Sequence, residues 1–414
     1  MIRTYLTLTL LSTLAASFIW GVNTLFLLDA GLSNAGAFTA NAFFTAGQVG
    51  FEIPTGVIAD TRGRRTSYLL GAATLLASTL LYVWMWQAGA ELWGWALASI
   101  LVGLGFTFFS GAVEAWLVDA LGANDYGGDL ESVFARGQVV AGVAMLVGSV
   151  TGGAIAQVTN LGVPYLLRAA LLAAVFVVAS VAMHDEGFTP HRGRGPVDDV
   201  RSVLAASLDH GWRNPPVRWV MLAAPFTAGA GVFAFYAMQP YLLQLYGDES
   251  AFGIAGLAAA IVASAQIIGG ILVPQIRRAF ARRTDALLGA VAVSGLTLLG
   301  LGLTSSFWVA LTLISIWALT FAASTPLRQA YINGVIPSEQ RATVLSFDAL
   351  MGSAGGVVAQ PALGRAADVY SFSVSYGFSA VITAMALPFY ALARREHAVS
   401  DPIGDQPASM LATP

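Results

Sequence analysis

The chain has 414 residues, of which 57% are hydrophobic and 10% are charged, and its mean hydropathy is +0.71. These values exclude an ordinary soluble globular protein and indicate a polytopic membrane protein. The chain has no cysteine, which excludes disulfides and thiolate metal sites, and the net charge of −3 says little by itself about partners.

Twelve apolar stretches are long enough to cross a hydrocarbon layer of about 30 Å as helices. Inside a bilayer the backbone has no water to bond, so stretches of this length are expected to be helical. We predict an all-α membrane protein with twelve transmembrane helices, at residues 4–29, 36–59, 66–88, 92–120, 132–159, 162–184, 217–246, 252–275, 286–303, 306–334, 342–368 and 372–394.

The longest polar break separates two apolar halves, and with the polar tail the chain has four parts. Residues 1–185 and 217–395 are expected to form two six-helix bundles. Between them, residues 186–216 form a cytoplasmic linker in which apolar residues recur at helical spacing, which predicts an amphipathic helix on the inner membrane surface. Residues 396–414 are expected to be a disordered cytoplasmic tail.

Arginines determine the predicted orientation, because the chain has no lysine. All of its arginines except Arg168, Arg328 and Arg365 fall on one side of the predicted topology or in its connections. The positive-inside rule makes that side cytoplasmic, together with both termini, and predicts a multi-pass protein of a plasma (inner) membrane. Arg168 and Arg365 lie on the arginine-poor side, where we expect their side chains to reach the surface; binding of an anionic ligand group is the alternative.

The second apolar stretch ends in a patterned polar loop. Its glycines and charges stand at Gly56, Asp60, Gly63, Arg64 and Arg65. This spacing resembles the signature loop between helices 2 and 3 of the major facilitator superfamily of secondary transporters, although Thr61 stands where that family usually has a basic residue. The resemblance implies two six-helix bundles that rock around a central cavity.

The resemblance also implies a cytoplasmic latch. In such transporters the loop carboxylate, here Asp60, meets the amino end of helix 11, here near Ala342 and Thr343, where unpaired N–H groups favour an anion. The arginine, here Arg64, pairs with a helix 4 carboxylate, here Asp119. The expected latch residues are Gly56, Asp60, Gly63, Arg64, Arg65 and Asp119.

Ionisable residues inside predicted spans are the candidates for proton coupling. These are Glu52, Glu114 and Arg136, because a charge in the bilayer costs roughly 2.5–3.5 kcal/mol on insertion scales and must be paired, hydrated or neutralised. Either Glu52 or Glu114 carries a transported proton, or these groups form a fixed ion-pair cluster between helices. For Asp119 we expect a structural role.

Polar and aromatic residues on the predicted helices are candidates for a substrate cavity. Asn41 and Gln48 share one helical face with Glu52. The full set of cavity candidates is Asn41, Gln48, Tyr236, Gln239, Gln266, Trp317 and Phe321. Arg328 and Asp348 lie towards the same ends of adjacent spans and are expected to form a structural pair.

Other fragments resemble the twelve-helix drug-efflux branch of the superfamily, namely residues 110–116 and 331–343. The antiporter motif of helix 5 lacks its proline in Gly148-Ser149-Val150-Thr151-Gly152-Gly153, which counts against antiport, and tight helix packing is the alternative role of these small residues.

The predicted function is proton-coupled export of a small lipophilic or amphipathic compound, by alternating access. The alternatives are a symporter or uniporter for a polar solute such as a sugar and a non-transporting membrane sensor. The sequence has no Gly-Lys-Ser/Thr phosphate loop, no zinc motif and no nucleophile–base set, so we expect no enzyme activity, cofactor or metal. The expected partners are the substrate, protons and the lipid bilayer, without nucleic acid, and the expected state is a monomer.

Overall fold

The computed structural model describes residues 1–188, 211–336 and 341–403. Apart from an isolated β-bridge, regular structure in these ranges is helical, as the apolar stretches predict. The amphipathic helix expected in the linker falls mainly on residues 189–210, outside the described ranges.

The amino-terminal half contains eight helices. They are α1 (Ile2–Trp20), α2 (Asn23–Asp29), α3 (Asn34–Arg62), α4 (Arg64–Ala88), α5 (Leu92–Phe109), α6 (Ala112–Ala123), α7 (Leu130–Val158) and α8 (Gly162–Ala182). The described part of the carboxyl-terminal half contains α10 (Pro215–Tyr246), α11 (Phe252–Ile271), α12 (Val273–Ala279), α13 (Arg283–Leu303), α14 (Phe307–Asn333), α15 (Arg341–Val369), α16 (Phe372–Ala384) and α17 (Leu387–Arg395).

Several predicted spans are interrupted rather than continuous. The span expected at 92–120 divides into α5 and α6 at Gly111, whose φ of +65° is a left-handed conformation that glycine adopts without steric cost. The span expected at 4–29 breaks between α1 and α2, and the last span breaks between α16 and α17 ahead of Pro388, which lacks the N–H that a continuous helix needs.

Ten helical segments in the described ranges are long and apolar enough to cross a membrane, with α5–α6 and α16–α17 each counted as one segment. The remaining two of the twelve predicted spans correspond to α3 and α15, which have 29 residues each but are more polar. These two helices pack against each other across the two halves of the molecule. Their polarity follows from that position, because they face the other bundle and the cavity between the bundles.

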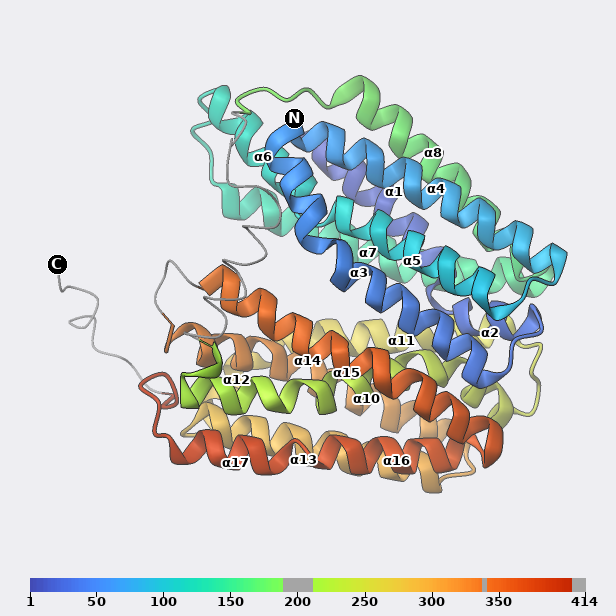
Figure 1. Cartoon of the computed structure of the whole chain (residues 1–414), viewed down its shortest axis with the longest axis vertical. Coiled ribbons are helices and arrows are strands. Elements are labelled where there is room, and N and C mark those ends of the chain that lie inside the picture. Colours follow the sequence, from blue (N-terminus) through green and yellow to red (C-terminus); the bar gives the residue numbers. More distant parts are fainter. Residues whose placement is uncertain (189–210, 337–340, 404–414) are drawn as a thin grey trace.

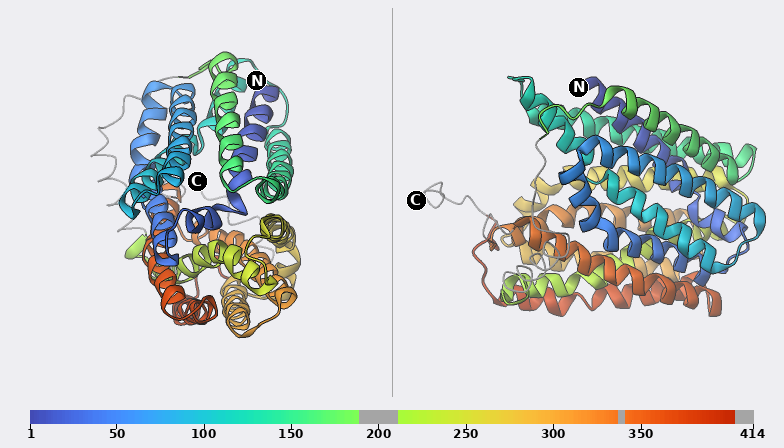
Figure 2. Two further views of the ribbon diagram at one scale, coloured as in Figure 1. Left: turned by 90° about the vertical axis from the view of Figure 1, so that its right-hand side faces the viewer. Right: turned by 45° about the horizontal axis from the view of Figure 1, so that its top comes forward.

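The two bundles meet at one end of the molecule and separate at the other. In Figure 1 they converge near α2 and diverge towards α6 and α12, and the left view of Figure 2, seen from the joined end, shows the two bundles side by side. The pairs α3–α15 and α7–α11 carry most of the contact between the bundles. A Cβ added to Gly153 would lie 2.7 Å from the Cα of Gly256, so α7 and α11 touch through glycine backbone.

The same motif in α7 also packs inside its own bundle. Added Cβ atoms at Gly148 and Gly152 would collide with Ser17 and with the backbone of Phe18 on α1. These glycines therefore permit close helix packing on two sides of α7, which is the alternative role considered for the helix 5 motif.

The segment after α17 folds back onto the carboxyl-terminal bundle. Asp401 is buried and accepts hydrogen bonds from the backbone N–H and the hydroxyl of Thr284, both at 2.9 Å. Ser400 is also buried and donates to the Tyr331 carbonyl at 2.6 Å. The disorder expected from residue 396 onward does not apply to residues 397–403, because Asp401 binds the free N–H groups at the start of α13.

Candidate functional site

A cavity of about 590 Å³ lies between the two bundles. Its size is within the range of small-molecule sites. Five of the residues predicted to face a substrate line it, namely Gln48, Tyr236, Gln266, Trp317 and Phe321. Further aromatic wall comes from Trp20, Phe44 and Phe235, so the cavity suits a ligand with a substantial apolar part.

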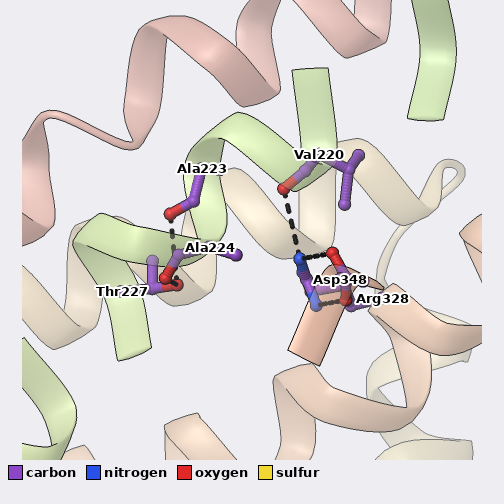
Figure 3. Close-up of polar contacts among 6 residues, drawn as sticks. All are labelled: Val220, Ala223, Ala224, Thr227, Arg328 and Asp348. Atoms are coloured by element: carbon purple, nitrogen blue, oxygen red, sulfur yellow. Dashed lines mark hydrogen bonds and ion pairs between the residues drawn. The ribbon is translucent and has the colours of Figure 1, made fainter. Parts of the chain in front are cut away.

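An ion pair lies in the wall of this cavity. Arg328 on α14 and Asp348 on α15 form a two-pronged contact, and Arg328 also donates to the Val220 carbonyl at 3.2 Å (Figure 3). Asp348 is 5% exposed. The two charges therefore neutralise each other at the cavity surface. Figure 3 also shows Thr227, whose hydroxyl donates to the carbonyls of Ala223 and Ala224 on its own helix.

A second, smaller cavity of about 80 Å³ adjoins the first. The two share the wall residues Trp20, Phe44 and Tyr236. Asn41, another predicted cavity residue, lines the smaller one together with Arg168. Arg168 is 2% exposed, so the expectation that its side chain reaches the membrane surface is wrong: it points into the amino-terminal bundle, where Thr79 accepts a hydrogen bond from its Nε at 3.1 Å.

The end at which the bundles meet is fastened by hydrogen bonds between them. The Gln239 side chain accepts from the Thr24 N–H and donates to the Trp20 carbonyl, both at 2.8 Å. Gln239 is therefore a bridge between bundles and does not line either cavity, unlike the other cavity candidates.

A carboxylate of the second bundle caps a helix of the first. Asp368, in the last turn of α15, accepts the N–H groups of Asn34 and Ala35 at 2.9 Å each. The next N–H, that of Gly36, bonds to the Ser33 hydroxyl. The first three N–H groups of α3 thus all have partners, and the two bundles are joined by a charge-assisted cap.

The predicted latch loop lies at the opposite, separated end. Arg64 Nη1 lies 2.5 Å from Asp60 Oδ1, and Arg64 Nε lies 3.8 Å from Asp119 Oδ2. Gly63 has a φ of +107°, and a Cβ there would lie 2.4 Å from Asp185 Oδ2. Asp185 accepts the N–H of Arg65 at 2.9 Å, so it caps the start of α4.

The rest of the loop lies within the amino-terminal bundle. Arg65 Nη2 donates to the Ser180 carbonyl at 2.8 Å, and Gly56 is exposed with nothing near its Cα that a side chain would meet. In this conformation the described partner of Asp60 is Arg64 and not α15.

The proton-coupling candidates are not gathered into one ion-pair cluster. Glu52 accepts a hydrogen bond from the Ser110 hydroxyl at 3.0 Å, beside the break between α5 and α6. Glu114 and Arg136 are both exposed, and Asp119 is engaged by Arg64. Neither glutamate lines the two cavities described above.

Sequence reasoning did not identify Asp368, Asp185 or Thr24. Their partners are distant in sequence: Asp368 binds residues more than 330 positions away. For Asp368 and Asp185 the local signal was a carboxylate at or just after the end of a predicted span, and such a signal does not identify the partner.

Comparison with known sequences gives two matches. The sequence profile of the Major Facilitator Superfamily matches residues 5–300 and, in a second match, residues 276–412. An uncharacterised MFS-type transporter of Methanocaldococcus jannaschii is 18% identical over 337 residues, which cover 80% of this chain and 82% of that protein.

Solved structures share the fold. A mutant of the nucleoside transporter NupG superposes with a TM-score of 0.76 at 11% identity, covering 94% of this chain and 99% of that one. The POT family transporter PepTSo gives 0.73 at 13% identity, covering 95% and 97%. A bacterial homologue of the human lysosomal transporter Spinster, inward-facing and unoccupied, gives 0.71 at 16% identity, covering 97% of each chain. At these identities the likeness concerns the fold alone.

Proposed function

The chain belongs to the Major Facilitator Superfamily, and from this premise we propose that it is a secondary active transporter that exports small lipophilic or amphipathic compounds in exchange for protons. Its bundles are proposed to rock about the central cavity in a plasma membrane, as a monomer with twelve spans. Both termini are proposed to lie in the cytoplasm, as the arginine distribution predicts.

One observation carries the proposal of alternating access. The cavity of about 590 Å³ lies between bundles that are joined at one end and separated at the other. In the described ranges, the hydrogen bonds between bundles come from residues at or towards the end opposite the arginine-rich loop. With that loop in the cytoplasm, the proposed conformation is inward-facing, the state in which the Spinster homologue of similar fold was crystallised.

The α3–α15 pair provides a physical basis for switching. These two helices run in opposite directions, so the amino end of α3 lies against the carboxyl end of α15, whereas the carboxyl end of α3 and the amino end of α15 both lie at the separated end. Asp368 near the end of α15 caps α3 in the present state. We propose that Asp60, near the end of α3, caps α15 in the outward-facing state, so that the two carboxylates act in alternation.

We propose that one of the membrane carboxylates Glu52 and Glu114 carries the coupled proton. Glu52 is supported by its place beside the α5–α6 break, where its bond to Ser110 changes if the carboxylate is protonated. Because Gly111 holds the left-handed conformation at that break, a change in the Glu52–Ser110 contact can be transmitted to the angle between α5 and α6.

Transport by everted membrane vesicles tests the proposal. The substrates are three fluorescent amphipathic dyes, one cationic, one neutral and one anionic, offered with and without a proton gradient. We expect gradient-dependent accumulation of at least one dye, lost in Asp60→Asn at equal membrane abundance. If no dye accumulates and gradient-independent uptake of a polar solute is found instead, the export proposal is wrong and the uniporter alternative is correct.

A further inference from the structure

In the described ranges two arginines of the membrane helices are withdrawn from solvent, Arg168 fully and Arg328 in part, and their surroundings differ. Arg328 is paired with Asp348. Arg168 has no ion pair among the described residues, and the ionisable groups that act on it are the phenols of Tyr165, Tyr82 and Tyr236. An unpaired cation in the membrane is costly to fold around, and such groups mark binding sites or ion pathways.

Few of the N–H groups of Arg168 are occupied. Its Nε donates to Thr79 at 3.1 Å, and its Nη1 makes a long contact of 3.5 Å with the Ala15 carbonyl. Its guanidinium carbon lies 5.7 Å from the centre of the Phe106 ring. The guanidinium has five N–H donors, so most remain free for a ligand in the adjoining cavity of about 80 Å³.

A second polar side chain with an unused donor belongs to the lining of the same small cavity. Asn41 is 4% exposed, and its Nδ2 has no hydrogen-bond partner. The orientation of this amide is set by a chain of hydrogen bonds: Tyr165 donates to Asn23 at 2.9 Å, and Asn23 donates to Asn41 Oδ1 at 3.1 Å. The oxygen of Asn41 is thus occupied while its two N–H groups are left for an acceptor.

The charge on the cavity walls selects an anion. The charged residues that line the two cavities are Arg168, Arg328 and Asp348, and the last two neutralise each other. The walls of the two cavities therefore carry one net positive charge, that of Arg168 in the smaller cavity. The larger, aromatic cavity adjoins it at the shared wall residues Trp20, Phe44 and Tyr236. A planar guanidinium matches a carboxylate in a two-pronged geometry.

We propose that Arg168 and Asn41 bind the carboxylate of an amphipathic monoanionic substrate whose apolar body occupies the larger cavity. This rests on the proposed transport function and narrows its substrate class from lipophilic or amphipathic compounds to organic carboxylates. A dianion would leave a charge uncompensated, and a cation would meet Arg168 without a counter-charge.

Binding to the purified full-length protein tests the site. The probes are radiolabelled 2-naphthoate and its neutral isostere 2-naphthamide, measured by equilibrium dialysis. We expect the wild type to prefer the naphthoate by on the order of tenfold or more, the scale of hydrogen bonds to a charged group. Arg168→Gln should bind both probes alike, whereas Arg365→Gln, which removes the exposed arginine predicted on the same side, should keep the preference.

A structural role for Arg168 predicts a different result. If Arg168 mainly holds helices together, Arg168→Gln lowers the melting temperature of the ligand-free protein; if it serves a ligand, removing an unpaired buried charge leaves that temperature unchanged or raises it. Asn41→Asp is a second variant, because its new carboxylate would neutralise Arg168 and abolish the naphthoate preference without removing the arginine.

The outcomes separate this proposal from the transport proposal. Equal affinity of the wild type for the two probes, or an undiminished preference in both Arg168→Gln and Asn41→Asp, would overturn the carboxylate site. Gradient-driven transport of the cationic dye alone would also overturn it, while leaving the transporter in place. Naphthoate preference without any vesicle transport or movement of the bundles would support the site and contradict the proposed transport.

Discussion

Replacing Asp368 by asparagine should shift the protein towards the outward-facing conformation. Asp368 accepts two N–H groups at the start of α3, each at 2.9 Å, and it is the charged group in that contact between bundles. The substitution keeps the size of the side chain but removes its charge and one strong acceptor. If Asp60 forms the corresponding cap in the opposite state, that state is unaffected by the change.

The expected change in the free-energy difference between the two conformations follows from the hydrogen bond and the charge that the substitution removes. Loss of one of the two accepted hydrogen bonds costs about 1 kcal/mol, within a range of roughly 0.5–1.5. Loss of a charge at an exposed helix end costs roughly 0.3–1 kcal/mol more. Since about 1.4 kcal/mol is a tenfold change, a total of about 2 kcal/mol changes the ratio of the two conformations about 30-fold. Raising the salt concentration should reduce the effect, because the contact is exposed.

Distances between spin labels on introduced cysteines measure this ratio, and the natural chain has no cysteine to interfere. One label pair, at Ala135 and Arg278, spans the separated end; a second, at Val158 and Leu303, spans the joined end. Under conditions in which both conformations are populated, Asp368→Asn should shorten the first distance and lengthen the second.

The matched control for this experiment is Glu249→Gln, which removes an exposed carboxylate from the connection that follows α10, without a described contact between bundles. The double variant Asp60→Asn/Asp368→Asn should return towards the wild-type ratio. If Asp368→Asn and Glu249→Gln differ by less than about twofold in population, the capping argument is refuted.

Three further predictions concern other contacts in the structure. Gly153→Leu should wedge α7 from α11, because a Cβ there already lies 2.7 Å from the Cα of Gly256, and should lengthen the Val158–Leu303 distance; no change would contradict the packing argument. Asp348→Asn should leave Arg328 without its counter-charge and destabilise the protein by roughly 1–3 kcal/mol, seen as a lower melting temperature. Combination with Arg328→Met should restore much of that loss, and equal melting of the single and double variants would disprove the pairing energy. Glu52→Gln should weaken the pH dependence of dye transport in vesicles, and an unchanged pH profile in Glu52→Gln, Glu114→Gln and the double variant would eliminate both carboxylates as proton carriers.

The membrane character of the chain could be read from the sequence because it depends on local composition. A run of about 20 apolar residues has to become a helix in lipid whatever its neighbours are. The loop at Asp60 and Gly63 was equally readable, since a turn glycine and flanking charges lie close together in sequence. The predicted spans accordingly coincide with the observed helices, except where they break: at Gly111, ahead of Pro388, between α1 and α2, and between α11 and α12.

The sequence predicted the Arg328–Asp348 pair, but tertiary structure decided which other charges have partners. Arg168 and Arg328 look alike in sequence, each a single arginine in an apolar helix, yet Asp348 neutralises one and no described carboxylate neutralises the other. Asp368 and Gln239 likewise acquire their roles from residues more than 200 positions away. The physical reason is that pairing depends on distances of a few ångströms between helices, which the relative placement of the bundles determines. Sequence alone established the class of protein and which polar residues its membrane helices contain. Only the packing of the bundles placed an unpaired cation beside an aromatic cavity.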